Sequence, residues 1–292
     1  MKTITVFTPT FNRAHLLPRL YDSLCKQTSG DFSWLIIDDG SSDGTQELVK
    51  QWQAEKKIEI EYHYKENGGM HTGHNVAYKR IKTELNVCID SDDYMPKDAV
   101  EKIVRFWNDL EDKQNYSGFV GLDVTEDGAI IGTKIPEDLK RGSYLNLYKS
   151  VTGDKKFVLV TEEVNKYPLY PEYKNEKLVP LGILYIMMGE EKDFAFTNDV
   201  YCVVEYQEDG STNSIFKQYR ESPLGFAYAR KIILKYDRSF ASQFKTYLHL
   251  ISSSIFAKDI SLAFKNVNPV KSLLVLPFGL LFHGYILMKI KT

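Results

Sequence analysis

Runs of β-branched and apolar residues alternate with helical patterns through the first third of the chain. The runs have the length and composition of strands; they are Thr3–Thr8, which stops at Pro9, Phe32–Ile37, Ile58–Tyr64 and Leu85–Ile89. Apolar residues at helical spacing between them predict helices over Ala14–Gln27, from Asp43, over His71–Ile81 and from Lys97. This β-α alternation favours an α/β fold with a doubly wound, mostly parallel sheet.

The pattern changes after about Asp109. Phe119–Asp123 and Ala129–Thr133 flank a turn pair, Asp127-Gly128, and therefore predict a hairpin. Residues 140–176 show no pattern that can be assigned. The remaining predicted elements are a helix over Glu176–Met188, a strand or strand pair over Phe194–Tyr206, and helices over Phe226–Tyr236, Phe240–Phe256 and Val270–Ile290.

Composition divides the chain into two parts. The 292 residues are 43% hydrophobic and 26% charged, which allows one large globular domain or one domain with an appendage. Residues 215–292 carry 12 Lys/Arg against 3 Asp/Glu, a net charge of +9, and the rest carries 25 against 36, a net of −11. We expect a domain over residues 1–215, with halves 1–109 and 110–215, and a basic helical extension over 216–292.

The extension contains an uncharged apolar run, Leu273–Met288, which is 16 residues long and is flanked by Lys271 and Lys289. A membrane span needs ~20 apolar residues and at least ~17, so this run is marginal, and Pro277 interrupts it. The basic helical segment before it resembles an interfacial helix. Peripheral attachment to a membrane surface is therefore predicted; a C-terminal helix docked on the catalytic domain is the alternative.

The N-terminus does not resemble a secretory signal. Met1 and Lys2 lead into a short strand that meets Pro9 too early for the apolar core of such a segment. We expect a cytoplasmic protein, peripheral on the inner face of the cell membrane. Nucleic acid is not an expected partner.

An acidic turn, Asp90-Ser91-Asp92-Asp93, follows the strand that ends at Ile89. Open α/β sheets place their ligands at the carboxyl ends of strands. Carboxylates this close repel one another unless a cation offsets them. Oxygen ligands suit Mg²⁺ or Mn²⁺, which one or two carboxylates and substrate phosphates usually hold. An acidic helix N-terminus is the alternative interpretation.

Two further polar loops follow strands at the same edge of the sheet. The first begins at Thr8-Pro9-Thr10 and the second at Asp38-Asp39. Neither contains G-x-G-x-x-G or the P-loop motif, which argues against a dinucleotide dehydrogenase and a P-loop NTPase.

Three segments together carry a family resemblance. Thr8-Pro9-Thr10-Phe11-Asn12-Arg13, the segment from Ile37 to Thr45, and Ile89-Asp90-Ser91-Asp92-Asp93 occur in this order on predicted strand ends. They resemble the N-terminal half of family 2 glycosyltransferases, which have the GT-A fold. The resemblance is strong over Met1–Asp109 and looser from there to about Asn213.

The resemblance implies a role for each matching position. Asp39 would accept a hydrogen bond from the uracil imide or the corresponding edge of another base, while Asp38 caps the following turn. Asp92 would hold the metal, Mn²⁺ or Mg²⁺, and Asp93 either assists it or caps the next helix. The other residues expected to contact the nucleotide are Thr8, Pro9, Thr10, Arg13, Asp90 and Ser91.

A glycine-rich loop, Asn67-Gly68-Gly69, precedes a predicted helix and is a further candidate. Glycine allows close backbone approach, and a helix N-terminus attracts anions. Gly69 and His71 are therefore expected at the nucleotide, although similar enzymes often have an arginine where His71 or His74 stands. An ordinary turn and helix start is the alternative.

The catalytic base is implied only by the resemblance. Inverting members of the family often have a Glu-Asp pair at a helix start beyond the hairpin, and here Lys177 replaces the aspartate. Glu176 is the expected base. Glu172 and the Glu162-Glu163 pair are rivals, and a solvated glutamate at a helix start is the structural alternative.

The sequence therefore predicts a metal-dependent, inverting glycosyltransferase. Its donor would be a nucleotide sugar, with UDP the expected nucleotide, and its acceptor a glycan or lipid-linked glycan in cell-surface polysaccharide synthesis. A non-catalytic nucleotide-sugar-binding module is the first alternative. A sugar nucleotidyltransferase is the second, but it would need a glycine-rich phosphate loop after the first strand.

Overall fold

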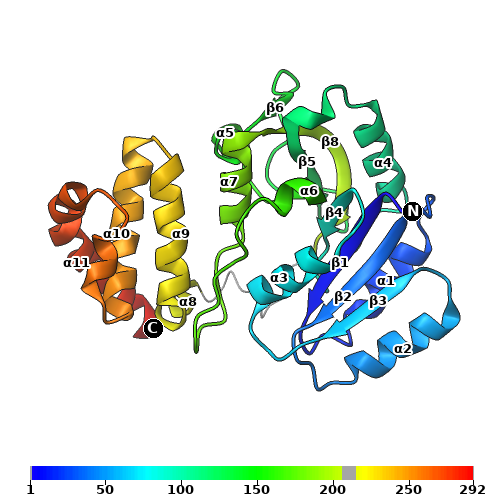
Figure 1. The fold of residues 1–292 in the computed structure, drawn as a ribbon, viewed down its shortest axis with the longest axis horizontal. Coiled ribbons are helices and arrows are strands. Elements are labelled where there is room, and N and C mark those ends of the chain that lie inside the picture. The colour runs from blue at the N-terminus through cyan, green and yellow to red at the C-terminus, as the bar shows by residue number, and fades with distance from the viewer. Residues whose placement is uncertain (1, 206–214, 292) are drawn as a thin grey trace. The chain divides into compact units, whose positions relative to one another are not determined.

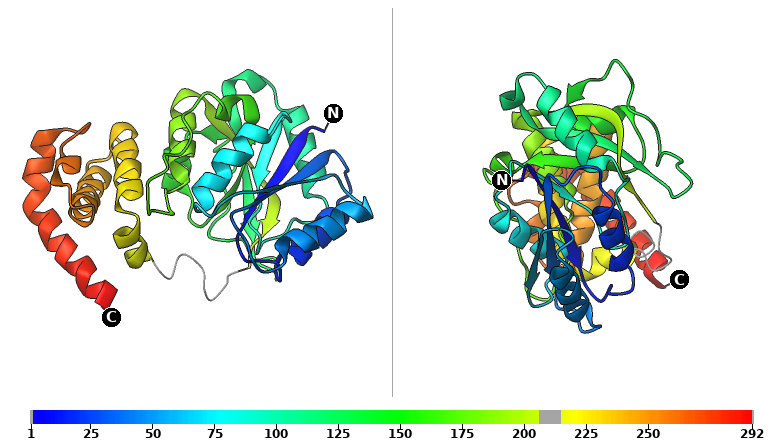
Figure 2. Two further views of the ribbon diagram at one scale, coloured as in Figure 1. Left: turned by 60° about the horizontal axis from the view of Figure 1, so that its bottom comes forward. Right: turned by 90° about the vertical axis from the view of Figure 1, so that its right-hand side faces the viewer.

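The computed structural model describes residues 2–205 and 215–291 and divides the chain into two compact units. Unit 1 consists of Met1–Pro168 and Met188–Gln207, and unit 2 of Leu169–Met187 and Glu208–Thr292. Figures 1 and 2 show the ribbon of both units.

Unit 1 is built on one eight-stranded sheet with strand order β3-β2-β1-β4-β7-β5-β8-β6. The strands are β1 (Ile4–Thr10), β2 (Phe32–Asp38), β3 (Ile60–Tyr64), β4 (Leu85–Cys88), β5 (Tyr116–Val124), β6 (Arg141–Gly142), β7 (Lys155–Val160) and β8 (Asp193–Val203). Strands β1 to β4 pair in parallel, as do β5 and β8, whereas β7 and β6 pair antiparallel with their neighbours. The α/β class and the mostly parallel sheet are confirmed.

Helices cover both faces of the sheet in unit 1 (Figure 1). They are α1 (Leu17–Cys25), α2 (Thr45–Glu55), α3 (Met70–Arg80), α4 (Ala99–Asp109), the 3₁₀ helix η1 (Lys113–Asn115), α5 (Tyr144–Ser150) and α6 (Thr161–Val164). Helices α1, α2 and α4 bury Leu20, Trp52 and Ile103 in one core with Trp34 of the sheet. On the other face, α3 packs edge-on against Phe7 through its aromatic rings. The sheet is therefore doubly wound, as predicted.

Strand β1 runs past Pro9 to Thr10, so the predicted stop at the proline is wrong. The pairing of β1 with β4 ends at Phe7 and Cys88, while the pairing with β2 continues to Thr10. Proline is tolerated where a strand lacks a partner on the side of its missing N–H. Pro9 lies beyond the β4 ladder, which explains why the strand continues.

Two predicted elements in the second half are shorter than expected. The helix predicted over Glu176–Met188 is α7, which begins at Gly182 and ends at Glu191. Pro180 explains the late start, because proline lacks an N–H and disfavours helical geometry in the residue before it. The second arm of the predicted hairpin forms only one antiparallel bridge, between Val124 and Ile130. Tyr206, the predicted end of the strand now seen as β8, lies outside the described residues.

Unit 2 combines an irregular segment, residues 169–181, with helices. Its elements are the first part of α7, then α8 (Ile215–Glu221), α9 (Pro223–Tyr236), α10 (Phe240–Phe256), the 3₁₀ helix η3 (Ile260–Ala263) and α11 (Pro269–Lys291). Its core gathers Tyr247, Leu250 and Ile251 of α10 with Ala227 of α9 and Val275 of α11. The three helices predicted from the sequence after Ser222 are all present.

Residues 169–187 belong to unit 2, whereas the expected boundary placed them in the first domain. The carboxylate of Glu176 accepts hydrogen bonds from the first backbone amides of α9. Gly225 of α9 also approaches Leu178 so closely that an added Cβ would lie 2.1 Å from the Leu178 carbonyl oxygen. These contacts tie the segment to the C-terminal helices.

Candidate active site

The polar loops predicted from the sequence meet at the carboxyl edge of β2, β1 and β4. Chain connections run from β1 to β2 and β3 on one side, and β4 then lies on the other side of β1. The carboxyl ends of β1 and β4 therefore form a topological switch point, where open α/β sheets bind their ligands. The acidic turn follows β4 at this place.

The loops after β1 and β2 hold each other through hydrogen bonds from backbone amides to side-chain oxygens. The Asn12 amide donates to Ser41 Oγ at 2.9 Å, and Asn12 Oδ1 accepts from the Ser42 amide at 2.8 Å. Thr8 points into the core, where its hydroxyl accepts a hydrogen bond from Trp34 Nε1 at 3.0 Å. Pro9 and Thr10 are buried and Arg13 is half-buried. The first loop is thus fixed in place, and Arg13 is its most accessible predicted site residue.

Asp38 and Asp39 have different environments. Asp38 accepts from the Ser41 amide at 2.7 Å and from the Tyr62 hydroxyl at 2.6 Å, so it caps the turn as predicted. The Asp39 carboxylate accepts from the backbone amides of Gly68 at 2.9 Å and Gly69 at 2.7 Å. The side chains of Lys65 and Asn67 also bond to it. Asp39 therefore holds the glycine-rich loop at the site.

The acidic turn is anchored on its C-terminal side. A guanidinium nitrogen of Arg19 donates to the backbone carbonyl of Asp92 at 2.5 Å, and the guanidinium lies 4.8 Å from the ring centre of Tyr94. Tyr94 in turn forms an antiparallel bridge with Val203. The side chains of Asp90 and Asp92 are half-buried, so they remain partly accessible.

Asp93 faces a mostly buried lysine, Lys156. Lys156 Nζ lies 3.9 Å from Asp93 Oδ2 and 3.9 Å from Asp123 Oδ2. Burial raises the pKa of Asp93 to about 7 and that of Asp123 to about 6, although Lys156 lowers both. Asp93 also accepts from the Glu205 amide at 3.3 Å. The helix-cap alternative for Asp93 is wrong, because α4 begins at Ala99 with Asp98 at its N-cap position.

The charges around the turn favour an added cation. The carboxylates of Asp90, Asp92 and Asp123 all raise the pKa of Asp93, and the mostly buried Lys156 is the cation that opposes them. Within residues 2–205 and 215–291, no group of three His, Cys, Asp or Glu side chains is arranged to hold a metal ion. Mg²⁺ and Mn²⁺ sites completed by substrate phosphates need only one or two carboxylates, and the partly accessible Asp92 can supply one.

The glycine-rich loop leads into α3, whose first turn contains two buried histidines, His71 and His74. His74 lies in the core: Nδ1 is 3.1 Å from the Tyr78 hydroxyl, and its ring packs edge-on against Phe7. Burial lowers the pKa of His74 to about 4, so it is neutral at physiological pH. Gly69 has a φ of +93°, a conformation that glycine adopts without strain.

The candidate bases lie in contrasting surroundings. Both carboxylate oxygens of Glu176 accept backbone amides, from Leu224 at 3.0 Å and Gly225 at 2.9 Å. Burial raises the pKa of Glu176 above its ordinary value, and the two amides oppose that shift. Glu172 is exposed. Glu163 of α6 is paired with Lys166 at 2.8 Å and Lys192 at 2.6 Å, so its carboxylate is held in two ion pairs.

Three cations that support the site were not identified from the sequence. They are Arg19, Lys65 and Lys156, which lie on α1, after β3 and on β7. Lys156 had a detectable signal: with Lys155 it begins a strand-like run, Lys155–Val160, whose other residues are apolar. A charge at such a position is rarely buried without a partner.

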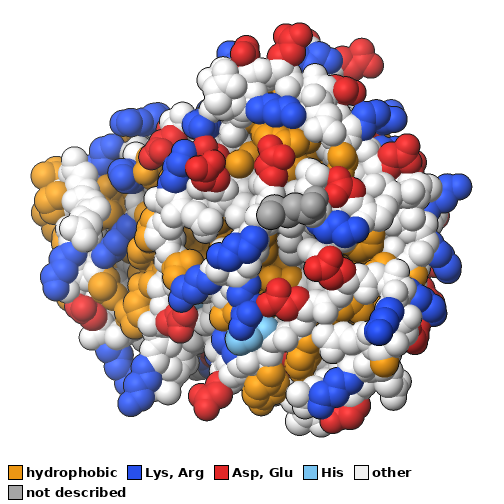
Figure 3. All heavy atoms as spheres, turned by 45° about the vertical axis from the view of Figure 1, so that its right-hand side comes forward, with side chains coloured by type: hydrophobic (Ala, Val, Ile, Leu, Met, Phe, Trp, Pro, Cys, Tyr) orange, Lys and Arg blue, Asp and Glu red, His pale blue; other side chains and the backbone are white. Residues whose placement is uncertain are grey.

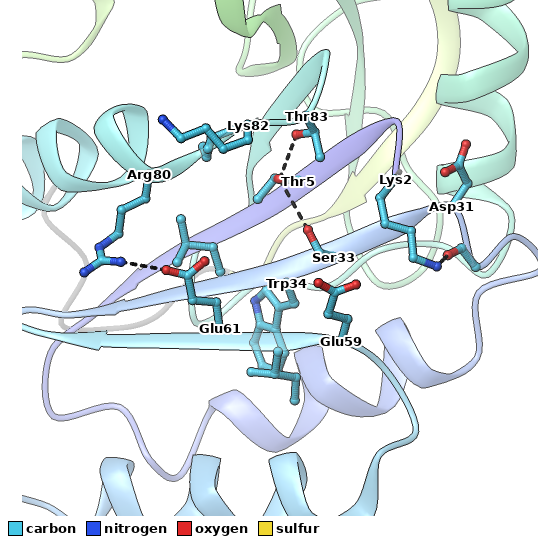
Figure 4. Close-up of a pocket in the computed structure, with 14 residues that line it drawn as sticks. Lys2, Thr5, Asp31, Ser33, Trp34, Glu59, Glu61, Arg80, Lys82 and Thr83 are labelled. Atoms are coloured by element: carbon cyan, nitrogen blue, oxygen red, sulfur yellow. Dashed lines mark hydrogen bonds and ion pairs between the residues drawn. The ribbon is translucent and has the colours of Figure 1, made fainter.

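A cavity of unit 1 lies elsewhere, at the amino ends of β1, β2 and β3. It has a volume of about 940 Å³ and is lined by Thr5, Ser33, Trp34 and Arg80, among others. Figure 4 shows the Thr5 hydroxyl between those of Ser33 and Thr83, and Arg80 paired with Glu61. This edge is opposite to the predicted site and carries none of the predicted residues.

The mostly parallel sheet, with polar loops at its switch point, defines an α/β protein with a fold of the GT-A type. Residues 5–148 match the profile described as Glycosyl transferase family 2, and this segment belongs to that family.

Curated relatives support this assignment. The chain is 27% identical over 117 residues to the putative teichuronic acid biosynthesis glycosyltransferase TuaG of Bacillus subtilis, covering 40% of this chain and 46% of TuaG. It is 29% identical over 108 residues to the poly(ribitol-phosphate) beta-N-acetylglucosaminyltransferase TarS of Staphylococcus aureus, covering 36% of this chain and 19% of TarS. The chain therefore spans less than half the length of these relatives.

Solved structures share the fold. S. aureus TarS 1-349 in complex with UDP-GlcNAc superposes with a TM-score of 0.65 at 19% identity, over 96% of this chain and 80% of that one. The mannosyltransferase PcManGT from Pyrobaculum calidifontis, in complex with GDP-Man and Mn²⁺, superposes with a TM-score of 0.54 at 16% identity, over 96% and 73%. At these identities the likeness concerns the fold alone.

Proposed function

We propose that the protein transfers a sugar from a nucleotide-sugar donor to a glycan hydroxyl, with inversion of the anomeric configuration. UDP-sugar is the proposed donor class, and cell-surface polysaccharide synthesis is the proposed setting. The observation that carries the proposal is the gathering of Asp39, Asp90 and Asp92 at the switch point of β1 and β4. The family assignment and the names of TuaG and TarS support the same class of reaction.

In the proposed donor site, Asp39 and the loop that it holds read the nucleobase. Thr8, Pro9 and Thr10 form the floor beneath the nucleotide, and Arg13 lies at its edge. Asp90 and Ser91 contact the ribose, and the amides at Gly69, with His71 in the first turn of α3, border the donor phosphates. Each of these assignments follows from the family resemblance and the location of the residue.

Asp92 would hold Mn²⁺ or Mg²⁺, and the bound metal would offset the charge of the departing nucleoside diphosphate. PcManGT is a structural neighbour that was solved in complex with Mn²⁺. Asp93 was expected beside Asp92 as a second ligand. Its contacts with Lys156 and the Glu205 amide support a different role for Asp93, in which it stabilises the acidic turn.

Glu176 is the proposed general base, with Glu172 as its alternative. It would take the proton of the acceptor hydroxyl, while the hydroxyl oxygen bonds to the anomeric carbon and the bond from that carbon to the diphosphate oxygen breaks. A raised pKa suits a carboxylate that must accept a proton near neutral pH.

The proposed acceptor is a glycan or a lipid-linked glycan at the cytoplasmic face of the cell membrane. Unit 2 supports attachment there, because residues 215–291 carry 12 Lys/Arg against 3 Asp/Glu. We also propose that residues 1–215 form the catalytic domain and that residues 216–292 form the basic extension that associates with the membrane.

Turnover of a nucleotide-sugar panel by the purified chain with Mn²⁺ tests the function. We expect one UDP-sugar to be transferred to a glycan acceptor, and hydrolysed slowly without one. A non-catalytic binding module is the competing function, because Glu176 is held by two amides. Tight binding of a nucleotide sugar, without transfer of its sugar to any offered acceptor and without its hydrolysis, would establish that alternative.

Asp39→Ala is expected to weaken UDP binding by roughly 10- to 100-fold. A hydrogen bond to a charged group is typically worth about 1.5–3 kcal/mol, and about 1.4 kcal/mol corresponds to tenfold. Titration calorimetry with UDP measures the effect, and circular dichroism checks that the fold is retained.

Because Asp39 also holds the glycine-rich loop, a second nucleotide separates its two roles. If Asp39 reads the base, the preference for UDP over CDP should shrink in Asp39→Ala. Equal weakening of both nucleotides would mean that the residue only positions the loop. Lys65→Met is the matched control, since it removes one partner of Asp39 and leaves both glycine amides.

A further inference from the structure

The outward face of α11 is apolar and exposed along its length. Leu274, Leu281 and Met288 recur every seven residues, and 69%, 76% and 64% of their surfaces are exposed. Other large apolar residues of the same helix are exposed as well: Val270, Leu273, Phe278, Leu280, Tyr285 and Leu287. An exposed apolar surface of this extent marks an interaction site.

The inner face of α11 is narrow and fixes the helix on α10. Its buried residues are Ser272, Val275, Gly279 and Ile286. Gly279 lies so close to α10 that an added Cβ would meet Ile251 at 2.7 Å, and Ser252 Oγ lies 3.0 Å from His283 Nδ1. The helix therefore packs along α10 within unit 2, and its outward face takes no part in this packing.

The outward face of α11 has no charged residues, and exposed lysines lie around it. Residues 272–288 carry no formal charge, whereas acidic and basic side chains are interspersed over the face of the molecule in Figure 3. Exposed lysines lie before, after and near the apolar run: Lys258, Lys265, Lys271 and Lys289. An apolar helix face with a basic border is the pattern of helices that lie in a membrane interface.

We propose that the outward face of α11 docks unit 2 on an anionic lipid bilayer, with the helix lying in the plane of the interface. This inference rests on the membrane attachment proposed above and names the surface responsible. It does not depend on the sugar-transfer activity.

Two observations favour this occupant and geometry. By length and composition α11 is the helix, within the described ranges, that could cross a membrane, but its uncharged apolar run Leu273–Met288, of 16 residues, is shorter than the ~20 needed. Crossing would also require α11 to leave Ile251 and Ser252. A second copy of the chain would bring two basic units together, whereas an anionic bilayer offers the opposite charge.

Vesicle sedimentation of the full-length protein, without any nucleotide sugar, tests the proposal. We expect binding to vesicles containing phosphatidylglycerol at low salt, weaker binding at high salt, and little binding to phosphatidylcholine alone. The double variant Leu274→Glu/Leu281→Glu should bind these vesicles at least roughly tenfold more weakly, because two leucine side chains that would enter the bilayer are replaced by charged ones. Gln46→Glu/Gln51→Glu is the matched control, since it adds the same charge at exposed positions of α2.

Three results would overturn the proposal. They are no sedimentation of the folded wild type, equal binding by the α11 variant and wild type, or equal losses in both double variants. Light scattering identifies the competing occupant: a wild-type dimer that dissociates in the α11 variant, without vesicle binding, would assign the face to a second copy. Sugar transfer to a soluble acceptor is measured separately. If no transfer is found, the sedimentation experiment still tests whether α11 binds the bilayer.

Discussion

Asp92→Asn is expected to remove most of the metal dependence of UDP binding and to slow sugar transfer by roughly 100-fold or more. The variant keeps the size of the side chain but loses the charge that would hold Mn²⁺ or Mg²⁺. A bound metal typically contributes several kcal/mol of charge stabilisation to the transition state, and about 1.4 kcal/mol corresponds to tenfold in rate. Titration calorimetry with UDP, in Mn²⁺ and in EDTA, gives the binding difference.

Asp98→Asn is the matched control for this experiment. Asp98 follows the acidic turn closely but pairs with Lys102 at 2.9 Å on α4. It should bind UDP like the wild type in both conditions. Equal UDP affinity of the wild-type protein with Mn²⁺ and with EDTA would show that the role proposed for Asp92 is wrong.

The sheet around this site could be predicted because its signals are local. The apolar runs of β1, β2 and β4 are short and buried, and each ends in polar residues. Parallel pairing then brings those ends to one edge, so the meeting of Asp39 with the acidic turn followed from topology alone. The helices after Ser222 were equally local, since their apolar spacing extends over several turns.

The surroundings of each site residue could not be predicted, because they depend on contacts far apart in the sequence. Nothing near Asp39 indicates that the amides of Gly68 and Gly69 will enclose its carboxylate. Nothing near Asp93 indicates that Lys156 will be its cation. Motifs of this kind give the location of a residue, while its charge environment comes from tertiary packing.

The segment around Glu176 shows a different limit. Its pattern predicted a helix from Glu176, but Pro180 delays α7 to Gly182, and the carboxylate instead binds the amides at the start of α9. A carboxylate at a helix N-terminus is stabilised by the free amides and the helix dipole. The residue proposed as the base thus has a structural task in addition.

Glu176→Gln is expected to reduce sugar transfer by ~10²–10⁴-fold while leaving donor affinity nearly unchanged. The amide cannot take a proton from the acceptor hydroxyl, although it has almost the same shape. The variant also sets an NH₂ group against one of the two α9 amides, so the melting temperature should fall modestly. Transfer rates, UDP titration and thermal melting together separate these effects.

Glu172→Gln is the decisive comparison, because Glu172 is the exposed rival four residues earlier. If Glu176 is the base, Glu172→Gln should keep most of the activity, and the wild-type rate should fall at acidic pH as Glu176 becomes protonated. The raised pKa of Glu176 moves that fall to a higher pH than for an ordinary glutamate. Near-normal transfer by Glu176→Gln with a lowered melting temperature would make it a helix cap only, and an inactive Glu172→Gln would then assign the base to Glu172.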